Sequence, residues 1–284
     1  MANSGQSIQF FCSKCNTLLK ETTSPDRPSS ISEECPCCGC QLSETLQTQM
    51  RKTSDALAQP QVPFQTAYEI NAKLALDIKD IDSFLALQLG DRLCVIGSDA
   101  NLLVARLCIR ALMSIRQGGI GAQSIVFVDA GNSSDIYQCV NFARQFGLEI
   151  QKVLRSIIVS RAFTIYQLAG VIAYELPKVI QRFNSKLVVI SDLLRMFVQD
   201  PQVSKKEAEY LISEIIKSVH KINNALVVLS LHDESPYNSQ ILQTFGKHIE
   251  IAREEKQLGI RLRNHRKSQQ VFMPEKELRT ALWR

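Results

Sequence analysis

Residues 92–115 read RLCVIGSDANLLVARLCIRALMSI, and this stretch decides the expected fold. Its first part, residues 92–97, is a short apolar run that ends at a glycine, which is typical of a buried β-strand. Its second part, residues 102–115, carries apolar residues at helical spacing. A strand followed directly by a helix is the repeating unit of α/β proteins, so we expect the unit to recur along the chain.

The alternation of strand-like and helix-like segments continues toward the C-terminus. Two helices open with a capping box, at Thr164 with Gln167 and at Ser204 with Glu207. Further strands are expected at residues 124–129, 155–160, 187–191 and 225–231, with closing strands at 248–252 and 259–264. Continuous apolar strands that alternate with amphipathic helices indicate an α/β fold, with a doubly wound, mainly parallel sheet and helices on both faces.

Several segments, in their order along the chain, match a known family. Residues 76–85 are similar to the G-I-x-x-L-D-x-L-L segment that leads into the first core strand of RecA-superfamily ATPases. Further matching segments are 126–132, 142–148, 157–162 and 186–193. Over about residues 66–265 the chain resembles this superfamily, and most closely the archaeal RadA-like and RadB-like recombinases, the eukaryotic recombinases and their paralogs. The resemblance implies a RecA-like fold, and another doubly wound α/β domain is the competing interpretation.

The chain departs from this family where the family binds phosphate. The resemblance implies a loop of the form G-x-x-x-x-G-K-[ST], but residues 97–104 read GSDANLLV. Leu102 replaces the second glycine, Leu103 replaces the lysine that faces the phosphates, and Val104 replaces the hydroxyl ligand of Mg²⁺. Asp99 adds a negative charge beside the phosphate position.

Other positions of the expected nucleotide site are also changed. The family's catalytic glutamate falls on Gly131, its Walker B aspartate on Ser191 beside Asp192, and its polar sensor on His232. The expected remnant of the site comprises Gly97, Asp99, Leu103, Val104, Asp129, Gly131, Ser191, Asp192 and His232. Phosphoryl transfer depends on cations and a positioned base, so we expect no ATP hydrolysis and do not expect ATP binding. An ATPase with a nonstandard site, using Asp129, Asp192 or His232, is the competing interpretation.

The C-terminal residues hold the chain's excess positive charge. From residue 253 to 284, nine Lys or Arg face four Asp or Glu, an excess that equals the formal net charge of +5 for the whole chain. Alternation along the strand places Arg261 and Arg263 on one face, followed by Arg266 and Lys267. Such a stripe suits phosphate contacts, which do not depend on base sequence. A solvated edge strand is the competing interpretation.

Two loops extend the nucleic-acid hypothesis. In the resembling recombinases, loops after the fourth and fifth strands touch single-stranded DNA. The corresponding segments here are 199–206 and 232–244. The resemblance implies that Lys205 and Lys206 contact phosphate and that Tyr237 stacks on a base.

Six of the nine cysteines lie in the first forty residues. Cys12 and Cys15 form one C-x-x-C motif, and Cys35 and Cys38 form a second of the form C-P-x-C-G. Two such turns let four thiolates reach one tetrahedral Zn²⁺. We therefore expect residues 1–45 to form a zinc ribbon, in which the zinc is structural because four sulfur ligands leave no open position.

A second register of the cysteines stays open. It uses Cys37 and Cys40 as the second ligand pair, although Pro36 and Gly39 favour the register given above. In the favoured register Cys37 and Cys40 are spare thiols without an assigned role. Redox cysteines or a disulfide pair are the competing interpretation of the whole cluster.

The remaining segments set the boundaries and exclude other classes of protein. Residues 46–63 are polar and contain two prolines, which predicts a linker before a core domain at 64–284. Apolar residues make up 45% of the chain, which excludes disorder of the whole. The N-terminus has no signal-peptide pattern, and no run approaches the roughly 20 apolar residues of a membrane span. We therefore expect a soluble, cytoplasmic protein with no membrane partner.

Together these features predict a catalytically inactive RecA-like recombinase paralog with an N-terminal zinc ribbon. It would serve as an accessory or mediator in DNA recombination and repair, and would bind single-stranded DNA, the active recombinase or another copy of itself. A protein-only scaffold or regulator that does not bind nucleic acid is the alternative from another class. The nonstandard ATPase is the third hypothesis.

Overall fold

The computed structural model describes residues 6–12, 18–22, 33–36, 40–41, 46–52, 71–97, 99–132, 135–232, 235–254 and 257–279. The chain divides into two compact units, residues 1–64 and 65–284. This division lies close to the boundary that the polar segment indicated.

The N-terminal unit contains a three-stranded antiparallel sheet. Its strands lie in the order β2 (Leu18–Thr22), β1 (Gln6–Cys12) and β3 (Leu46–Lys52). The prediction of a linker from residue 46 is therefore corrected, because residues 46–52 form a strand that pairs with β1 along its whole length. This strand is held by backbone pairing with β1, which does not require an apolar pattern. Its polar sequence therefore did not indicate a strand. The rest of the expected linker, 53–63, lies outside the described residues.

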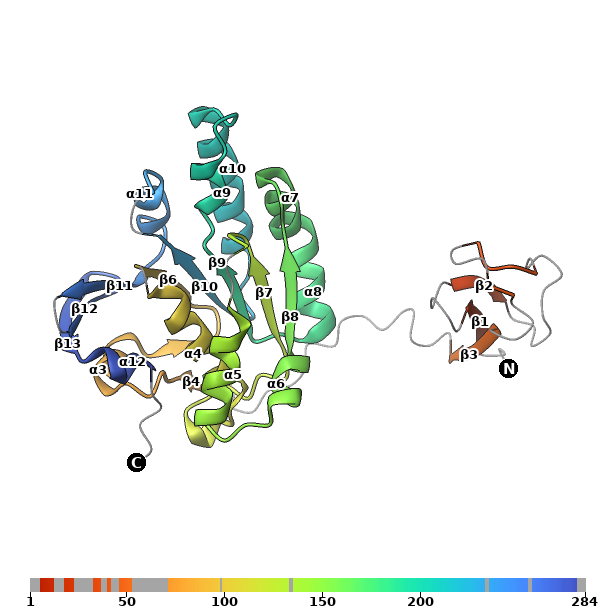
Figure 1. Cartoon of the computed structure of the whole chain (residues 1–284), viewed down its shortest axis with the longest axis horizontal. Helices are drawn as coiled ribbons and strands as arrows, with labels where there is room; N and C mark the ends of the chain where they lie inside the picture. Colours follow the sequence, from red (N-terminus) through yellow and green to blue (C-terminus); the bar gives the residue numbers. More distant parts are fainter. Residues whose placement is uncertain are drawn as a thin grey trace. The chain divides into compact units, whose positions relative to one another are not determined.

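The second unit is built on an eight-stranded sheet (Figure 1). The order is β13-β12-β11-β6-β10-β9-β7-β8. The strands β11, β6, β10, β9, β7 and β8 run parallel, β12 is antiparallel to β11, and β13 is antiparallel to β12. The strands are β6 (Arg92–Ile96), β7 (Ile125–Asp129), β8 (Ile157–Arg161), β9 (Leu187–Ser191), β10 (Leu226–Leu231), β11 (Lys247–Glu254), β12 (Gln257–Asn264) and β13 (Lys267–Met273). A short antiparallel pair, β4 (Lys73–Leu74) and β5 (Leu87–Gln88), precedes β6.

Helices cover both faces of this sheet. Alternate residues of β6 show the two faces, because Leu93 and Val95 belong to one apolar cluster and Cys94 and Ile96 to the other. The first face is covered by α3 (Lys79–Leu85), α4 (Ala100–Leu112), α5 (Ile136–Gln145), α6 (Ile150–Ser156) and α12 (Glu275–Arg279). The second is covered by α7 (Ile165–Gly170), a π turn (Val171–Glu175), α8 (Leu176–Phe183), α9 (Arg195–Gln199), α10 (Lys205–His220) and α11 (Asn238–Leu242). A 3-10 turn (Ile115–Gln117) follows α4.

The predicted α/β class, with its mainly parallel sheet and two helical layers, is confirmed. The arrangement is consistent with a Rossmann-like or RecA-like layout. The strands predicted at 92–97, 124–129, 187–191 and 225–231 each lie within one or two residues of the observed strands. Among the described residues, no helix combines the length and the apolar character that crossing a membrane requires.

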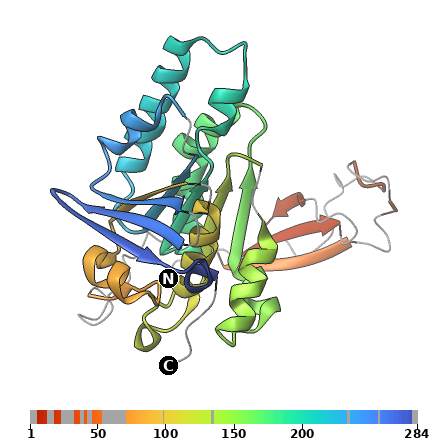
Figure 2. The ribbon, with the colours of Figure 1, turned by 60° about the vertical axis from the view of Figure 1, so that its left-hand side comes forward.

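Two elements differ from the sequence prediction. The strand expected at 155–160 is β8, which begins later because α6 continues to Ser156. The strand β13 was not expected, because four consecutive residues, Lys267 to Gln270, are exposed and polar. It is an edge strand that pairs only with β12 in the sheet, and Figure 2 shows the two (blue) as a hairpin.

Candidate functional site

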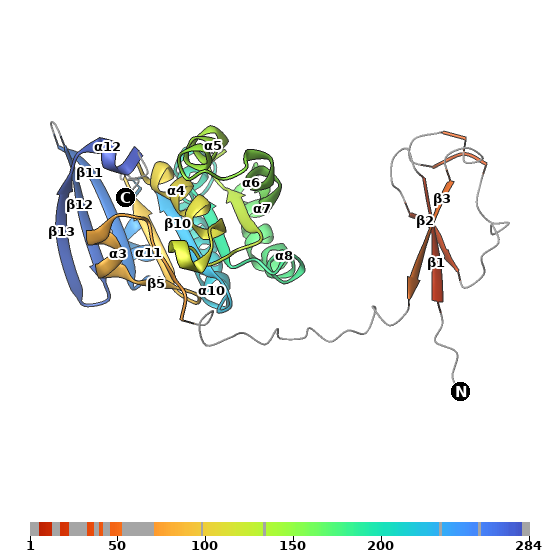
Figure 3. The same cartoon turned by 90° about the horizontal axis from the view of Figure 1, so that it is seen from below.

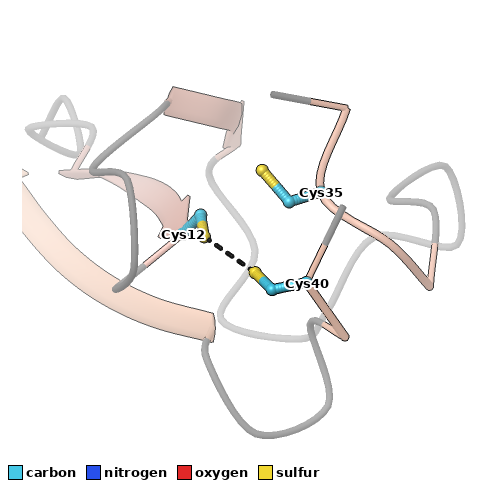
Figure 4. Close-up of side chains that lie close together, drawn as sticks. All are labelled: Cys12, Cys35 and Cys40. Atoms are coloured by element: carbon cyan, nitrogen blue, oxygen red, sulfur yellow. Dashed lines mark hydrogen bonds between the residues drawn. The ribbon is translucent and has the colours of Figure 1, made fainter. Parts of the chain in front are cut away.

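Three cysteine sulfurs meet in the N-terminal unit (Figure 4). The Sγ atoms of Cys12, Cys35 and Cys40 lie within 4.8 Å of one another, and Cys12 Sγ is 3.3 Å from Cys40 Sγ. Cys12 and Cys35 are buried, at 0% and 2% exposure. Thiolates about 2.3 Å from one tetrahedral ion stand about 4 Å apart, so this spacing suits a metal ion.

The cluster brings together part of the predicted ligand set. Cys12 and Cys35 belong to the favoured register, whereas Cys40 belongs to the alternative one. The backbone N–H of Cys35 donates to the carbonyl of Cys40 (2.9 Å), which places the two cysteines across a small hairpin. Cys15, Cys37 and Cys38 lie outside the described residues. Cys40 was a spare thiol in the favoured register, because Pro36 and Gly39 favoured Cys35 and Cys38 as the second ligand pair.

The first turns of α4 face the protein core where the resemblance implies a phosphate loop. Leu103 and Val104 are 0% and 1% exposed, Leu102 is 7% exposed, and all three pack in the apolar cluster on the α4 face. Gly97 has φ = 126° and lies against β11, so that a Cβ there would be 2.2 Å from the carbonyl oxygen of Ile251. Leu102, Leu103 and Val104 are thus core residues at the positions where the resemblance implies a phosphate loop.

Asp99, which precedes α4, is engaged by two arginines. Its Oδ2 is 3.0 Å from Arg253 Nη2, and its Oδ1 is 3.6 Å from Arg279 Nη2. The hydrogen bond to Asp99 raises the pKa of Arg253, and the charges of Asp99 and Glu275 add to this effect. The sequence showed the basic character of the C-terminal stretch but gave no sign that it returns to Asp99.

The remaining carboxylates of the expected remnant are also engaged. Asp129, at 0% exposure, accepts hydrogen bonds from Arg161 Nε (3.1 Å) and from Ser191 Oγ (3.3 Å). Asp192 accepts from Asn101 Nδ2 at 2.9 Å. These contacts hold the carboxylates in a hydrogen-bonded network at the carboxyl ends of the parallel strands.

The other two remnant positions have ordinary surroundings. The backbone N–H of Gly131 donates to the carbonyl of Ser191 (3.2 Å). His232 is exposed just after β10, and its carbonyl accepts from Asn238 Nδ2 (2.9 Å). Neither residue supplies a side-chain acid or base to the network around Asp129.

Sequence reasoning missed a buried arginine on α4. Arg106 is 0% exposed and donates to the carbonyls of Leu76 (2.6 Å), Glu277 (2.8 Å) and Leu278 (3.1 Å). Burial lowers the pKa of Arg106 to about 10. The available signal was the position of an arginine on the apolar face of a predicted helix, since such a side chain must find several acceptors.

A basic groove lies between the end of α11 and the β12–β13 hairpin. Its volume is about 700 Å³, and its lining includes Arg263, His265 and Arg266 of the hairpin with Ser239, Gln243 and Thr244 of the α11 side. Arg263 Nε donates to the carbonyl of His265 at 3.2 Å, which orients the guanidinium. His265 packs on Gly246, where a Cβ would be 2.5 Å from the imidazole Cε1. The residues that line this groove include no acidic side chain.

The basic residues predicted from the C-terminal stretch separate into two groups. Arg263 and Arg266 line the groove, and Lys267 follows them at the start of β13. Arg261 instead forms an ion pair with Glu250 of β11 (3.1 Å), which balances its charge.

Lys205, Lys206 and Tyr237, the side chains predicted to bind DNA, follow the carboxyl ends of the parallel strands, whereas the tip of the β12–β13 hairpin lies at their amino ends. Asn264 pairs with Lys247, the first residue of a strand parallel to β6, so the hairpin tip is at the amino edge. Lys205 and Tyr237 lie on connections that leave the carboxyl ends of β9 and β10. Lys205 is 3.9 Å from Glu209, Lys206 is exposed, and Tyr237 packs against the second apolar cluster. The predicted loop 232–244 nevertheless reaches the basic groove, because its residues Ser239, Gln243 and Thr244 line the groove together with Arg263 and Arg266.

No family model matches this chain, and no curated protein matches it either. The fold, the cysteine cluster, the first turns of α4 and the basic groove are the features of this chain that bear on its function.

Proposed function

We propose that this protein is a catalytically inactive RecA-like paralog of a recombinase, which acts as an accessory or mediator in DNA recombination and repair. It binds single-stranded DNA, the active recombinase or both. The order of motif-like segments supports the family, and the mainly parallel sheet with its two helical layers is compatible with it. The N-terminal cysteine cluster holds a structural Zn²⁺ in this proposal.

The residue types in the first turns of α4 support the proposed lack of catalysis. Leu103 and Val104 are core residues and offer neither a cation nor an Mg²⁺ ligand. Asp129 and Asp192 are held by neighbouring side chains. We expect no ATP turnover, and a turnover that disappears in Asp192→Ala would instead support the nonstandard ATPase.

The basic groove is the observation that carries the DNA-binding proposal. Single strands are bound by cationic grooves that follow the phosphates and by rings that stack on bases. Arg263 and Arg266 supply the charge, and neither is in an ion pair with any side chain that the structure describes. His265 is exposed, and its ring packs against Gly246. The exposed part of the ring is available to stack on a base.

Fluorescence anisotropy with a labelled single-stranded oligo(dT) tests this proposal in the full chain loaded with zinc. The double variant Arg263→Gln/Arg266→Gln should bind about tenfold more weakly. Its slope of log K against log salt should fall by about 1.4, because each phosphate contact on a single strand contributes about 0.7. The matched control is Lys152→Gln/Arg155→Gln, which removes the same charge from the exposed surface of α6.

The outcomes separate the hypotheses. A loss seen only in Lys205→Gln/Lys206→Gln would place DNA at the carboxyl edge, as the loop resemblance implies. If the unaltered protein fails to bind at low salt, the DNA proposal is wrong and the protein-only scaffold takes its place.

Exposed apolar side chains near β8 support the proposal of a protein partner. Val159 of this edge strand is 50% exposed, and Phe163 and Tyr166, at the start of α7, are 74% and 56% exposed. Exposed apolar side chains beside an edge strand are typical of protein interaction surfaces. A recombinase of like fold is the partner we propose.

A further inference from the structure

Asp99 lies between two guanidinium groups that come from distant parts of the chain. Arg253 belongs to β11 and Arg279 to α12, and both reach the turn that joins β6 to α4. The Asp99 side chain is only 9% exposed, whereas the side chains of Arg253 and Arg279 are 55% and 46% exposed. The arginines are therefore open to solvent on one side and closed by a carboxylate on the other.

The two arginines keep their positions through contacts other than Asp99. Glu275 accepts from Arg279 Nε at 2.7 Å and lies 3.4 Å from Arg253 Nη2. The helix α12 lies beside α4 (Figure 3), and its Leu278 is fully buried. The buried Arg106 holds the carbonyls of Glu277 and Leu278, so α12 is anchored independently of Asp99.

We propose that the Asp99 carboxylate is a built-in anion that closes a two-arginine anion site, and that Arg253 and Arg279 take a phosphate group once this charge is removed. Guanidinium groups bind carboxylate and phosphate through the same paired geometry. An anion attached to the chain has a high local concentration and excludes a free anion from solution. We call the contact of Asp99 with Arg253 and Arg279 the latch. It keeps phosphate-bearing ligands away from the start of α4.

Calorimetric titration with inorganic pyrophosphate tests this latch in the full chain. The Asp99→Asn variant, which keeps the shape of the side chain, should bind pyrophosphate at least tenfold more tightly than the unaltered protein. The control Asp80→Asn removes the same charge from an exposed position on α3 and should bind like the unaltered protein. Asp99→Ser provides a second variant should the amide disturb folding.

A further variant decides whether the two arginines form the site. Adding Arg253→Gln and Arg279→Gln to Asp99→Asn should abolish the gained affinity, with circular dichroism confirming the fold. The proposal is overturned if Asp99→Asn binds no better than Asp80→Asn, or if the arginine substitutions leave the affinity unchanged. Equal binding by the unaltered protein and by Asp99→Asn would also overturn it. These results are independent of DNA binding, because the latch and the basic groove have no lining residue in common.

Discussion

Arg106 carries the strongest prediction at the scale of a single residue. Its guanidinium joins α4 to the segment before α3 and to α12 through hydrogen bonds to the backbone carbonyls of Leu76, Glu277 and Leu278. Arg106→Met keeps much of the apolar stem but leaves these acceptors unpaired, and each such loss costs about 1–3 kcal/mol. We expect the free energy of unfolding to fall by about 3 kcal/mol in urea titrations followed by circular dichroism. Arg116→Met, at an exposed position, is the control and should change it by less than about 0.5 kcal/mol. Equal stability of the two variants would contradict the structural role of Arg106.

Some features of single residues could be predicted from the sequence, and contacts between distant residues could not. The sequence showed directly that Leu103 and Val104 do not fit the phosphate-binding motif of the resembling family, because that motif fixes which residue types the chemistry requires. The contacts of Asp99 with Arg253 and Arg279 span more than 150 residues, and charge counting alone cannot pair groups so far apart. Cys40 was already a candidate ligand in the alternative register, but the sequence did not decide between the two registers, and the backbone hydrogen bond between Cys35 and Cys40 places Cys40 beside Cys12 and Cys35.

The residue at which a helix begins is set by local hydrogen bonds, and the N-cap of α7 allows a test of this rule. Thr164 Oγ1 accepts from the backbone N–H of Gln167 (3.1 Å), as the capping box predicted, while the Gln167 side chain accepts from the N–H of Phe163. Thr164→Ala should lower the free energy of unfolding by about 1 kcal/mol, because one N–H of the first turn loses its acceptor. Thr164→Ser retains the hydroxyl, so its free energy of unfolding should stay close to that of the unaltered protein. Chemical denaturation of the three proteins measures both effects, and equal midpoints for the alanine and serine variants would contradict the cap.

Whole elements were predicted where burial imposes a pattern and missed where it does not. The central strands β7, β9 and β10 are buried throughout, so their apolar runs were unambiguous. The strands β3 and β13 are held by backbone pairing with one neighbour, and a polar edge strand has no periodic apolar signal. The end of α6 and the start of β8 meet without a turn residue, which displaced the predicted boundary.

At the scale of the whole molecule, the two compact units should respond differently to metal removal. The described core of the N-terminal unit around the cluster consists of Cys12 and Cys35 with Leu19 and Cys40 packed against them, whereas two large apolar clusters stabilise the second unit. We therefore expect metal binding to supply folding energy to the first unit. A chelator should remove one equivalent of zinc and unfold residues 1–64, while the thermal transition of residues 65–284 stays unchanged. Zinc analysis combined with calorimetry on the full chain measures both.

Cysteine variants assign that metal to particular ligands. Cys35→Ser and Cys40→Ser should each lower the zinc content well below one equivalent and abolish the transition of the first unit, because each removes a thiolate from the cluster. Cys139→Ala, on α5 of the second unit, is the control and should retain the full equivalent. Full zinc content in Cys40→Ser would favour the register of Cys12, Cys15, Cys35 and Cys38, in which Cys40 is not a ligand. A loss of zinc from Cys139→Ala would contradict the assignment of the metal to the N-terminal cysteines, because Cys139 belongs to the other compact unit.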